Sequence, residues 1–202
     1  MDRRRLAIAG FVVFGLLAGW ALFFGLPHWY ASRQAQVQAG TAAAPPPPAA
    51  PGAPVRKITA TLYYVAEDGM ALAPVQRDVP FGATVPEQAR AIVEAQLAPP
   101  AGTTPPLVSA IPPDVKLRDV YLTERGDAFV DLSSEIVSKH PGGSLDEIFT
   151  VYSIVNALTV NLPAITRVQI LVDGKEVDTL AGHVDLRHPL AKSLDWVVHE
   201  SH

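Results

Sequence analysis

The 202-residue chain contains no cysteine, which excludes disulfide bonds and a lipid-modified N-terminal cysteine. An oxidising compartment permits disulfides but does not require them, so this absence leaves the redox compartment open. Aromatic residues make up only 7% of the chain. Few side chains are therefore present for stacking against sugar rings.

Dense basic tracts are also missing after residue 5. From Val55 onward the chain has 12 basic and 19 acidic residues, a net charge of −7 with histidine neutral. An acidic domain of this kind is not expected to bind nucleic acid or anionic headgroups through its charge. The sequence also lacks a Gly-x-Ser-x-Gly elbow, a phosphate-binding loop and a dinucleotide fingerprint, so these enzyme classes have no signature here.

One long apolar run contrasts with this composition. Residues 6–26 carry no charge, and at about 1.5 Å per residue they span the ~30 Å hydrocarbon core of a bilayer. Arginines occupy residues 3–5, and Trp29 and Tyr30 follow at the position of an interfacial aromatic belt. We expect a single-pass helix, with residues 1–5 inside and the domain outside the cytoplasmic (inner) membrane. A cleaved signal peptide is the alternative, although the run exceeds the usual h-region of ~7–15 residues.

Residues 27–54 have the composition of a linker. From residue 34 to residue 54 the chain has no charge and little apolar bulk, so it cannot bury enough surface to offset the entropy of ordering. Four consecutive prolines at 45–48 favour a semi-rigid polyproline II spacer. The domain is expected to cover residues 55–190, with a tail at 191–202.

Alternating side chains and glycine turns predict the strands of this domain. The expected strands are residues 57–65, 72–79, 115–123, 127–132, 167–172 and 175–179. Pro74 favours an edge position for the second of them. Gly126 suits a tight hairpin, and Asp173-Gly174 is a type I′ turn signal between the last two strands.

Two helices are predicted, and each opens with the same pattern. Thr84-Val-Pro-Glu87 and Ser144-Leu-Asp-Glu147 both match a capping box, in which a hydroxyl and a carboxylate satisfy free amides at the helix start. The helices are expected to end near Leu97 and Leu162, where prolines follow. Because most strands are joined as hairpins, we predict an α+β domain with a mixed or largely antiparallel sheet and helices packed on one face.

Several segments, taken in order, match a known domain. They are the strand ITATLYYV, the helix end EAQLAPP, the stretch SAIPPDVKLRDVYLTERGDAFVDLSSEI, the helix with YSIVNALTVNLPAITRV, and QILVDGKEVDTLAGHVDLRHPL. Ile111-Pro112, Val130–Ser133, Ala157–Thr159 and Leu171–Gly174 carry the likeness in combination. Over residues 58–189 the chain resembles the sporulation and spore germination (GerMN) domain. The resemblance implies a bacterial envelope module that acts in assembly or at the cell wall and is not known as an enzyme.

Several polar motifs have both a structural and a functional interpretation. Asp131-Leu-Ser-Ser-Glu135 is typical of a segment that satisfies backbone groups rather than of a ligand site. Gly142-Gly143-Ser144 can hold an anion at a helix N-terminus, but a helix cap also explains it. The carboxylate pairs Glu67-Asp68 and Asp146-Glu147 would need to face one another across a cleft to act as acid and base.

One cluster has the residue types of a metal site: His183, Asp185 and His188. On an extended segment His183 and Asp185 share a face, and His188 falls on the other. A catalytic zinc site usually has three protein ligands. We therefore expect no metal site, no catalytic residues and no cofactor.

We predict a non-enzymatic, membrane-anchored envelope module that binds a protein partner or assembles with itself and does not bind nucleic acid. The alternative is recognition of peptidoglycan or another wall glycan. A glycan reader would use exposed aromatic side chains, for which Tyr63, Tyr121 and Phe129 are candidates. A scaffold would use a strand edge, either residues 72–79 or residues 175–179.

Overall fold

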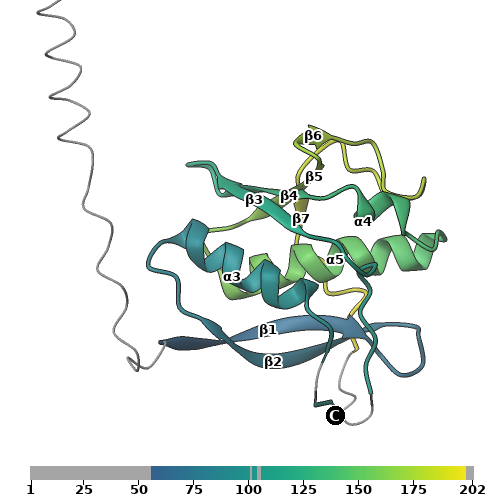
Figure 1. Ribbon diagram of the computed structural model, residues 1–202, viewed down its shortest axis with the longest axis horizontal. Helices are drawn as coiled ribbons and strands as arrows, with labels where there is room; N and C mark the ends of the chain where they lie inside the picture. The colour runs from purple at the N-terminus through teal and green to yellow at the C-terminus, as the bar shows by residue number, and fades with distance from the viewer. Residues whose placement is uncertain (1–55, 101, 104–105, 199–202) are drawn as a thin grey trace, which may run out of the picture. The chain divides into compact units, whose positions relative to one another are not determined.

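In the computed structural model, which describes residues 56–100, 102–103 and 106–198, two long helices lie between two β-sheets (Figure 1). The first sheet is an antiparallel ribbon of β1 (Lys57–Val65) and β2 (Leu72–Pro80). The second sheet has the strand order β3-β4-β5-β6, with β7 also paired to β5. The β4–β5 pair is parallel and the other pairs are antiparallel, so this sheet is mixed, as predicted.

The second sheet and the helices follow the sequence pattern closely. Its strands are β3 (Leu117–Leu122), β4 (Asp127–Leu132), β5 (Arg167–Val172), β6 (Lys175–Glu176) and β7 (Leu190–Ala191). The helices are α3 (Val85–Leu97), the short α4 (Glu135–Ser138) and α5 (Ser144–Asn161). The strands β4 and β5 thus have the expected bounds, and β3 lies within the expected 115–123. The elements α4 and β7 were not predicted, and β6 is shorter than the expected 175–179.

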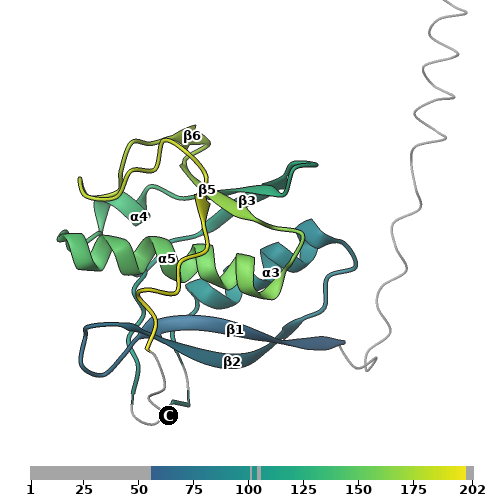
Figure 2. The ribbon, with the colours of Figure 1, turned by 180° about the vertical axis from the view of Figure 1, so that it is seen from behind.

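The position of the helices differs from the expectation of one sheet with helices on one face. The strands β1 and β2 form a separate ribbon, and α3 and α5 contact both the ribbon and the second sheet. Buried side chains of β1 on the side of Ala60, Leu62 and Tyr64 belong to the same core as those of the helices. A helix pair with apolar residues on two sides can cover two sheets, which produces the layered arrangement seen from both directions in Figures 1 and 2.

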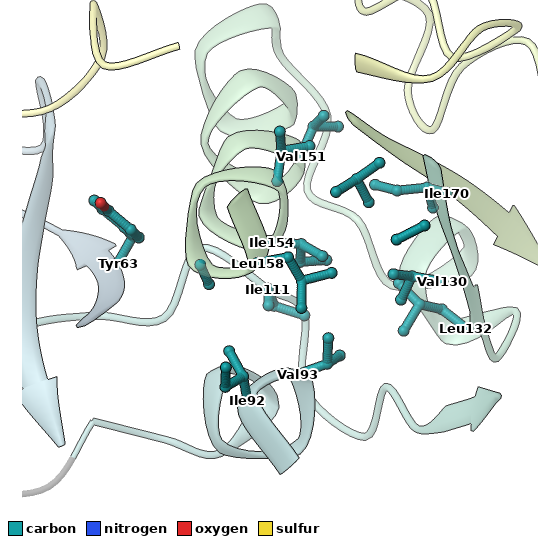
Figure 3. Packing of buried hydrophobic residues seen from close by; sticks show 14 of the residues in the cluster. Tyr63, Ile92, Val93, Ile111, Val130, Leu132, Val151, Ile154, Leu158 and Ile170 are labelled. Atoms are coloured by element: carbon teal, nitrogen blue, oxygen red, sulfur yellow. The ribbon is translucent and has the colours of Figure 1, made fainter. Parts of the chain in front are cut away.

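The centre of the core lies where α5 faces the second sheet. Ile154 and Leu158 of α5 lie near Val130 and Ile170 of the sheet, with α3 close by (Figure 3). These side chains are at most 1% exposed. The predicted deep burial of the second helix is therefore confirmed.

Polar side chains of α5 also hold segments that are distant in the sequence. The bonded pairs are Glu147 with residues 180–183, Thr150 with Ala110, Asn156 with Ser193, and Asn161 with Thr61. All these side chains except that of Asn161 are fully buried. Because buried polar groups need partners, α5 fixes the loops around it as well as the core.

Residues 191–198, which we expected to form a tail, continue the fold. After β7 the chain crosses α5 toward the ribbon (Figure 2). Asn156 bonds both backbone groups of Ser193. The backbone of Leu72 then donates to Trp196 (2.7 Å) and accepts from Val198 (2.9 Å).

None of the helices that the structure describes is long and apolar enough to cross a membrane. The span predicted at residues 6–26 and the linker at 27–54 lie outside the described residues.

Candidate functional site

The outer edge of β1, the neighbour of the suggested edge at residues 72–79, is occupied by other parts of the domain. Outward-facing backbone groups of alternate β1 residues are each bonded by another element: Thr61 by Asn161, Tyr63 by Gln96, and Val65 by Val108. Asn161 and Gln96 use both ends of their amides, at 2.7–2.9 Å. A partner strand would have to break these bonds to add to β1.

The outer edge of β2 is also a poor template. Its first residue, Leu72, is paired with the C-terminal segment. Pro74 lies opposite Tyr63, whose backbone points away from the ribbon, so Pro74 also faces the open edge and has no N–H to donate there. The other suggested edge, residues 175–179, is paired over only two residues of β6.

The three candidate aromatic residues have different environments. Tyr63 is 3% exposed, so the prediction of an exposed ring was wrong; α3 contacts β1 here, and burial raises the pKa of the Tyr63 hydroxyl. Tyr121 is 53% exposed, and its cross-strand partner Phe129 is half-buried. A hydrogen bond to the Asp119 carboxylate raises the pKa of Tyr121. One exposed tyrosine beside a half-covered ring is a small surface for a sugar.

The Asp131–Glu135 motif satisfies the backbone, as its structural interpretation predicted. Asp131 is 5% exposed and accepts hydrogen bonds from the Gly174 amide (2.7 Å) and the Arg118 guanidinium (3.1 Å). Gly174 follows Asp173 in the hairpin turn, where both residues have positive φ (75° and 49°), as a type I′ turn requires. Ser133 accepts the amide of Lys116 (2.9 Å).

The predicted capping box at Ser144–Glu147 does not form. Gly143 is the N-cap residue of α5, with φ of 90°, and no side chain caps this helix. Glu147 is fully buried and accepts backbone amides of residues 180, 181 and 183 at 2.7–2.9 Å. Burial raises the pKa of Glu147, but these amides together with that of Val184 outweigh it and hold the pKa below its ordinary value.

The cluster at residues 183–188 is exposed and does not converge. His183, Asp185 and His188 all lie at the surface. The Asp185 carboxylate is bonded by the Arg187 guanidinium (2.7 and 2.9 Å), which holds the pKa of Asp185 well below its usual range. A hollow of about 260 Å³ lies over this loop. Within the described residues no group of three or more His, Cys, Asp or Glu is placed to hold a metal ion.

An apolar groove lies between the end of α3 and the proline-rich loop that follows it. Its volume is about 480 Å³, and its lining residues are Leu97, Pro99, Val108, Ser109, Ile111, Pro112, Pro113 and Asp114. Ile111 is 5% exposed and forms part of the core, while Val108 is 65% exposed. Val108 is fixed in place because its backbone pairs with Val65. Val108 therefore adds an apolar side chain on a paired backbone to the exposed part of the groove.

The polar residues of this groove are already bonded. The Ser109 hydroxyl donates to the Ile111 carbonyl (3.2 Å) and accepts the Ile111 amide (3.1 Å). The Asp114 carboxylate is bonded by Lys139 (2.5 Å), which lowers the pKa of Asp114. The groove therefore offers apolar contact rather than hydrogen bonds.

Some residues of this groove belong to motifs that are recognisable in the sequence. Those motifs did not predict that the residues form a binding surface. Ile111-Pro112 belongs to the motif set that carried the resemblance, but no binding role was predicted for it. Leu97 was named only as the expected end of a helix, and no binding role was predicted for Pro99 or Val108. The available signal was the density of proline and aliphatic residues in 98–113, a composition that favours an exposed loop with apolar side chains.

Comparison with known proteins gives one family. The family model Germane, described as sporulation and spore germination, matches residues 61–178. The sequence matches no curated protein.

This chain is similar to several solved structures at low identity. The tandem GerMN domains of the sporulation protein GerM from Bacillus subtilis match at 18% identity and a TM-score of 0.52, over 67% of this chain and 46% of that one. The first GerMN domain of the same protein matches at 18% identity and a TM-score of 0.50, over 66% and 97%. A putative lipoprotein from Clostridium perfringens matches at 23% identity and a TM-score of 0.47, over 71% and 93%. This chain therefore spans about half of the tandem structure.

Proposed function

Because the chain belongs to the Germane family of sporulation and spore germination domains, we propose that it is a non-enzymatic module of the bacterial envelope that binds a protein partner. The occupant that we assign to the apolar groove is an aliphatic segment of that partner, which can be a different envelope protein or a second copy of this chain. The N-terminal apolar run anchors the module in the cytoplasmic membrane, with the domain outside. The linker allows the domain to extend away from the bilayer surface.

The observation that carries this proposal is the groove's chemistry. Its lining is aliphatic and proline-rich, and its two polar residues are bonded within the domain. A sugar would find few hydrogen-bond partners there, whereas an aliphatic side chain would bury apolar surface against Val108 and Leu97. The buried carboxylates of Asp131 and Glu147 bond backbone amides, so they support folding rather than acid–base chemistry.

Site-specific photocrosslinking in intact cells tests the proposal. A photoreactive amino acid at position 108 of the full chain should give one defined protein adduct. The matched control is position 160, a valine of α5 that is 36% exposed and lies outside the groove. An adduct of twice the chain's mass would identify a second copy as the partner. Equal labelling at both positions, or none at 108, would contradict the proposal.

A wall glycan is the second candidate because Tyr121 is exposed beside Phe129. Co-sedimentation with purified peptidoglycan sacculi distinguishes the two functions. Binding that Tyr121→Ala abolishes and Val108→Asp leaves intact would favour the glycan and overturn the groove.

The membrane anchor has its own test. A C-terminal reporter that is active only outside the cytoplasm should be active, and the mature protein should keep its N-terminus. A soluble form that begins near residue 35 or 40 would show a cleaved signal peptide instead.

A further inference from the structure

The strand β3 forms one edge of the second sheet, and none of the described strands pairs with its outer side (Figure 1). The amide of Thr123 donates to the carbonyl of Asp127, and β3 pairs with β4 in the same register up to this point. Because hydrogen-bonded and non-hydrogen-bonded pairs alternate in an antiparallel ladder, the backbone of Tyr121 bonds toward β4, whereas Val120 and Leu122 direct their backbone groups to the open edge. An edge of this kind can accept another strand.

A side chain of the same strand occupies part of this edge. The Asp119 carboxylate accepts the Val120 amide at 2.8 Å, and the same oxygen is bonded by the Arg90 guanidinium of α3. The bond from the Val120 amide, followed by that from the Tyr121 hydroxyl, holds the pKa of Asp119 below its ordinary value, which favours the charged carboxylate. An added strand needs the Val120 N–H as a donor, so it must displace this carboxylate.

The outward backbone groups of β3 are complementary to those of a second β3. In an antiparallel pair with a two-fold axis at Tyr121, Val120 of one copy lies opposite Leu122 of the other copy, and both residues direct their N–H and C=O groups into the interface. The side chain of Tyr121 is 53% exposed, and in this register it meets its own copy as a non-hydrogen-bonded pair. The edge therefore fits a second copy of the same strand.

The charges at the two ends of β3 favour the same arrangement. Arg118 and Asp119 lie near its start, and Glu124 and Arg125 lie in the turn after its end. Antiparallel pairing of two copies brings these ends together, with Glu124 near Arg118 and Arg125 near Asp119 of the other copy. Each acid then meets a base, whereas parallel pairing in register would place like charges side by side.

We propose that the edge of β3 is an assembly surface for a second copy of this chain, and that the Asp119 carboxylate, positioned by Arg90, restricts the pairing because it occupies the Val120 amide. Pairing of the wild type should therefore be weak, and loss of the carboxylate should strengthen it. The edge shares no residue with the lining of the apolar groove. The inference goes beyond the proposed function and does not require a partner in the groove.

Disulfide crosslinking of the full chain in isolated membranes, with an added oxidant, tests this surface, because the chain has no cysteine of its own. Tyr121→Cys places two thiols opposite each other, where the Cα atoms of a non-hydrogen-bonded pair lie about 4.5 Å apart, within the range of a disulfide. The matched control is Thr123→Cys, an exposed position just after β3 whose two copies would lie about 13 Å apart. A covalent dimer should form at position 121 and not at position 123.

The role of Asp119 is measured with the same crosslink. Asp119→Ala frees the Val120 amide and should raise the rate of dimer formation at position 121 severalfold. Asp119→Asn retains an oxygen that can accept this amide, so its rate should stay near that of the chain with Asp119. Equal crosslinking at 121 and 123, or no dimer at 121 in any of these variants, would overturn the surface. A rate in Asp119→Ala no higher than in the others would overturn the role of the carboxylate.

Two further measurements keep the outcomes distinct. Arg90→Ala leaves the carboxylate in place but removes its bond to α3, so the crosslinking rate at position 121 should rise here too. This variant decides the role of Asp119 if Asp119→Ala does not fold, and an unchanged rate would then overturn that role. Photocrosslinking at position 108 reports on the groove separately, so failure of the proposed function and failure of this inference are distinguishable.

Discussion

The starts of α3 and α5 use their glutamates in different ways. At α3, Glu87 accepts the amide of Thr84 (3.1 Å), and the Thr84 hydroxyl accepts the amide of Glu87 (3.3 Å), which completes a capping box at the surface. At α5, Ser144 is exposed and caps nothing, and Glu147 is buried against residues 180–183. The two segments have the same residue pattern, so the pattern alone does not decide between these roles.

The difference arises from what lies beside each helix start. Thr84 and Glu87 face solvent, so the amides of their own helix are the partners within reach. The start of α5 lies beside a loop whose amides at Leu180, Ala181 and His183 would be unpaired without Glu147. A buried amide without a partner costs about 1–3 kcal/mol, more than a helix cap contributes. The Glu147 carboxylate therefore stabilises the folded state more by bonding the loop amides than it would by capping α5.

The largest expected effect comes from removal of the buried carboxylate of Glu147. Glu147→Ala leaves three amides unpaired and should lower the free energy of unfolding by about 3–5 kcal/mol. The matched variant Glu87→Ala removes an exposed cap and should cost about 1 kcal/mol or less. Urea denaturation of a soluble fragment, residues 55–202, measures both. Equal losses would show that Glu147 is only a cap.

A change of the packing around the same helix should have a comparable effect. Leu158 is fully buried on α5, and Leu158→Ala should cost about 2–5 kcal/mol. Val160, two residues later, is 36% exposed, and Val160→Ala should change stability by no more than about 0.5 kcal/mol. Coincident urea midpoints for Leu158→Ala and the wild type would contradict the central position of α5.

The charge of the Glu147 carboxylate should make stability depend on pH. Burial pushes the pKa of Glu147 up, but its backbone donors hold it below the ordinary 4.5. A carboxylate with a lowered pKa contributes stability above its unfolded pKa and loses it as pH falls through the folded pKa. The wild type should therefore lose stability more steeply below about pH 4.5 than Glu147→Gln. Parallel pH profiles of the urea midpoints would show that the charge of Glu147 contributes nothing.

The two hydroxyls at the helix starts give a smaller and direct contrast. Thr84→Ala removes a cap and should cost about 1 kcal/mol. Ser144→Ala removes an exposed hydroxyl without a capping bond and should stay within about 0.5 kcal/mol. A loss of 1 kcal/mol or more in Ser144→Ala would show that the capping box forms in solution.

These contrasts show which features the sequence could predict. The strands at 57–65, 127–132 and 167–172 have their expected bounds because alternation along a strand is a local property. The same holds for Asp173-Gly174, since a type I′ turn needs positive φ at both residues. Nothing beyond neighbouring residues enters either inference.

Features that depend on distant partners could not be predicted in this way. Gln96 and Asn161 close the β1 edge across separations of 33 and 100 residues. The residue pattern of a helix does not indicate which distant backbone group an Asn or Gln side chain of that helix will bond. The groove is a similar case, because the exposure of Val108 depends on its pairing with Val65 and on the end of α3. The sequence therefore predicted most of the strands, the two long helices and the family, but not the surface that we propose for binding.

The smallest expected effect concerns the exposed histidines of the loop whose backbone amides are bonded by Glu147. His183 and His188 are exposed, and Asp185 is bonded to Arg187, so no convergent ligand set is present on this loop in the structure. The double variant His183→Ala/His188→Ala should change stability by no more than about 1 kcal/mol, and neither zinc nor a chelator should shift the melting temperature. Thermal melts of both proteins, with metal analysis of the purified wild type, provide the measurement. Because a true zinc site would stabilise the folded state by mass action, stoichiometric zinc together with a melting shift of several degrees on chelation would contradict this prediction. It would also mean that the loop is held from outside as much as by Glu147, and the contrast between the buried carboxylate and the exposed histidines would no longer hold.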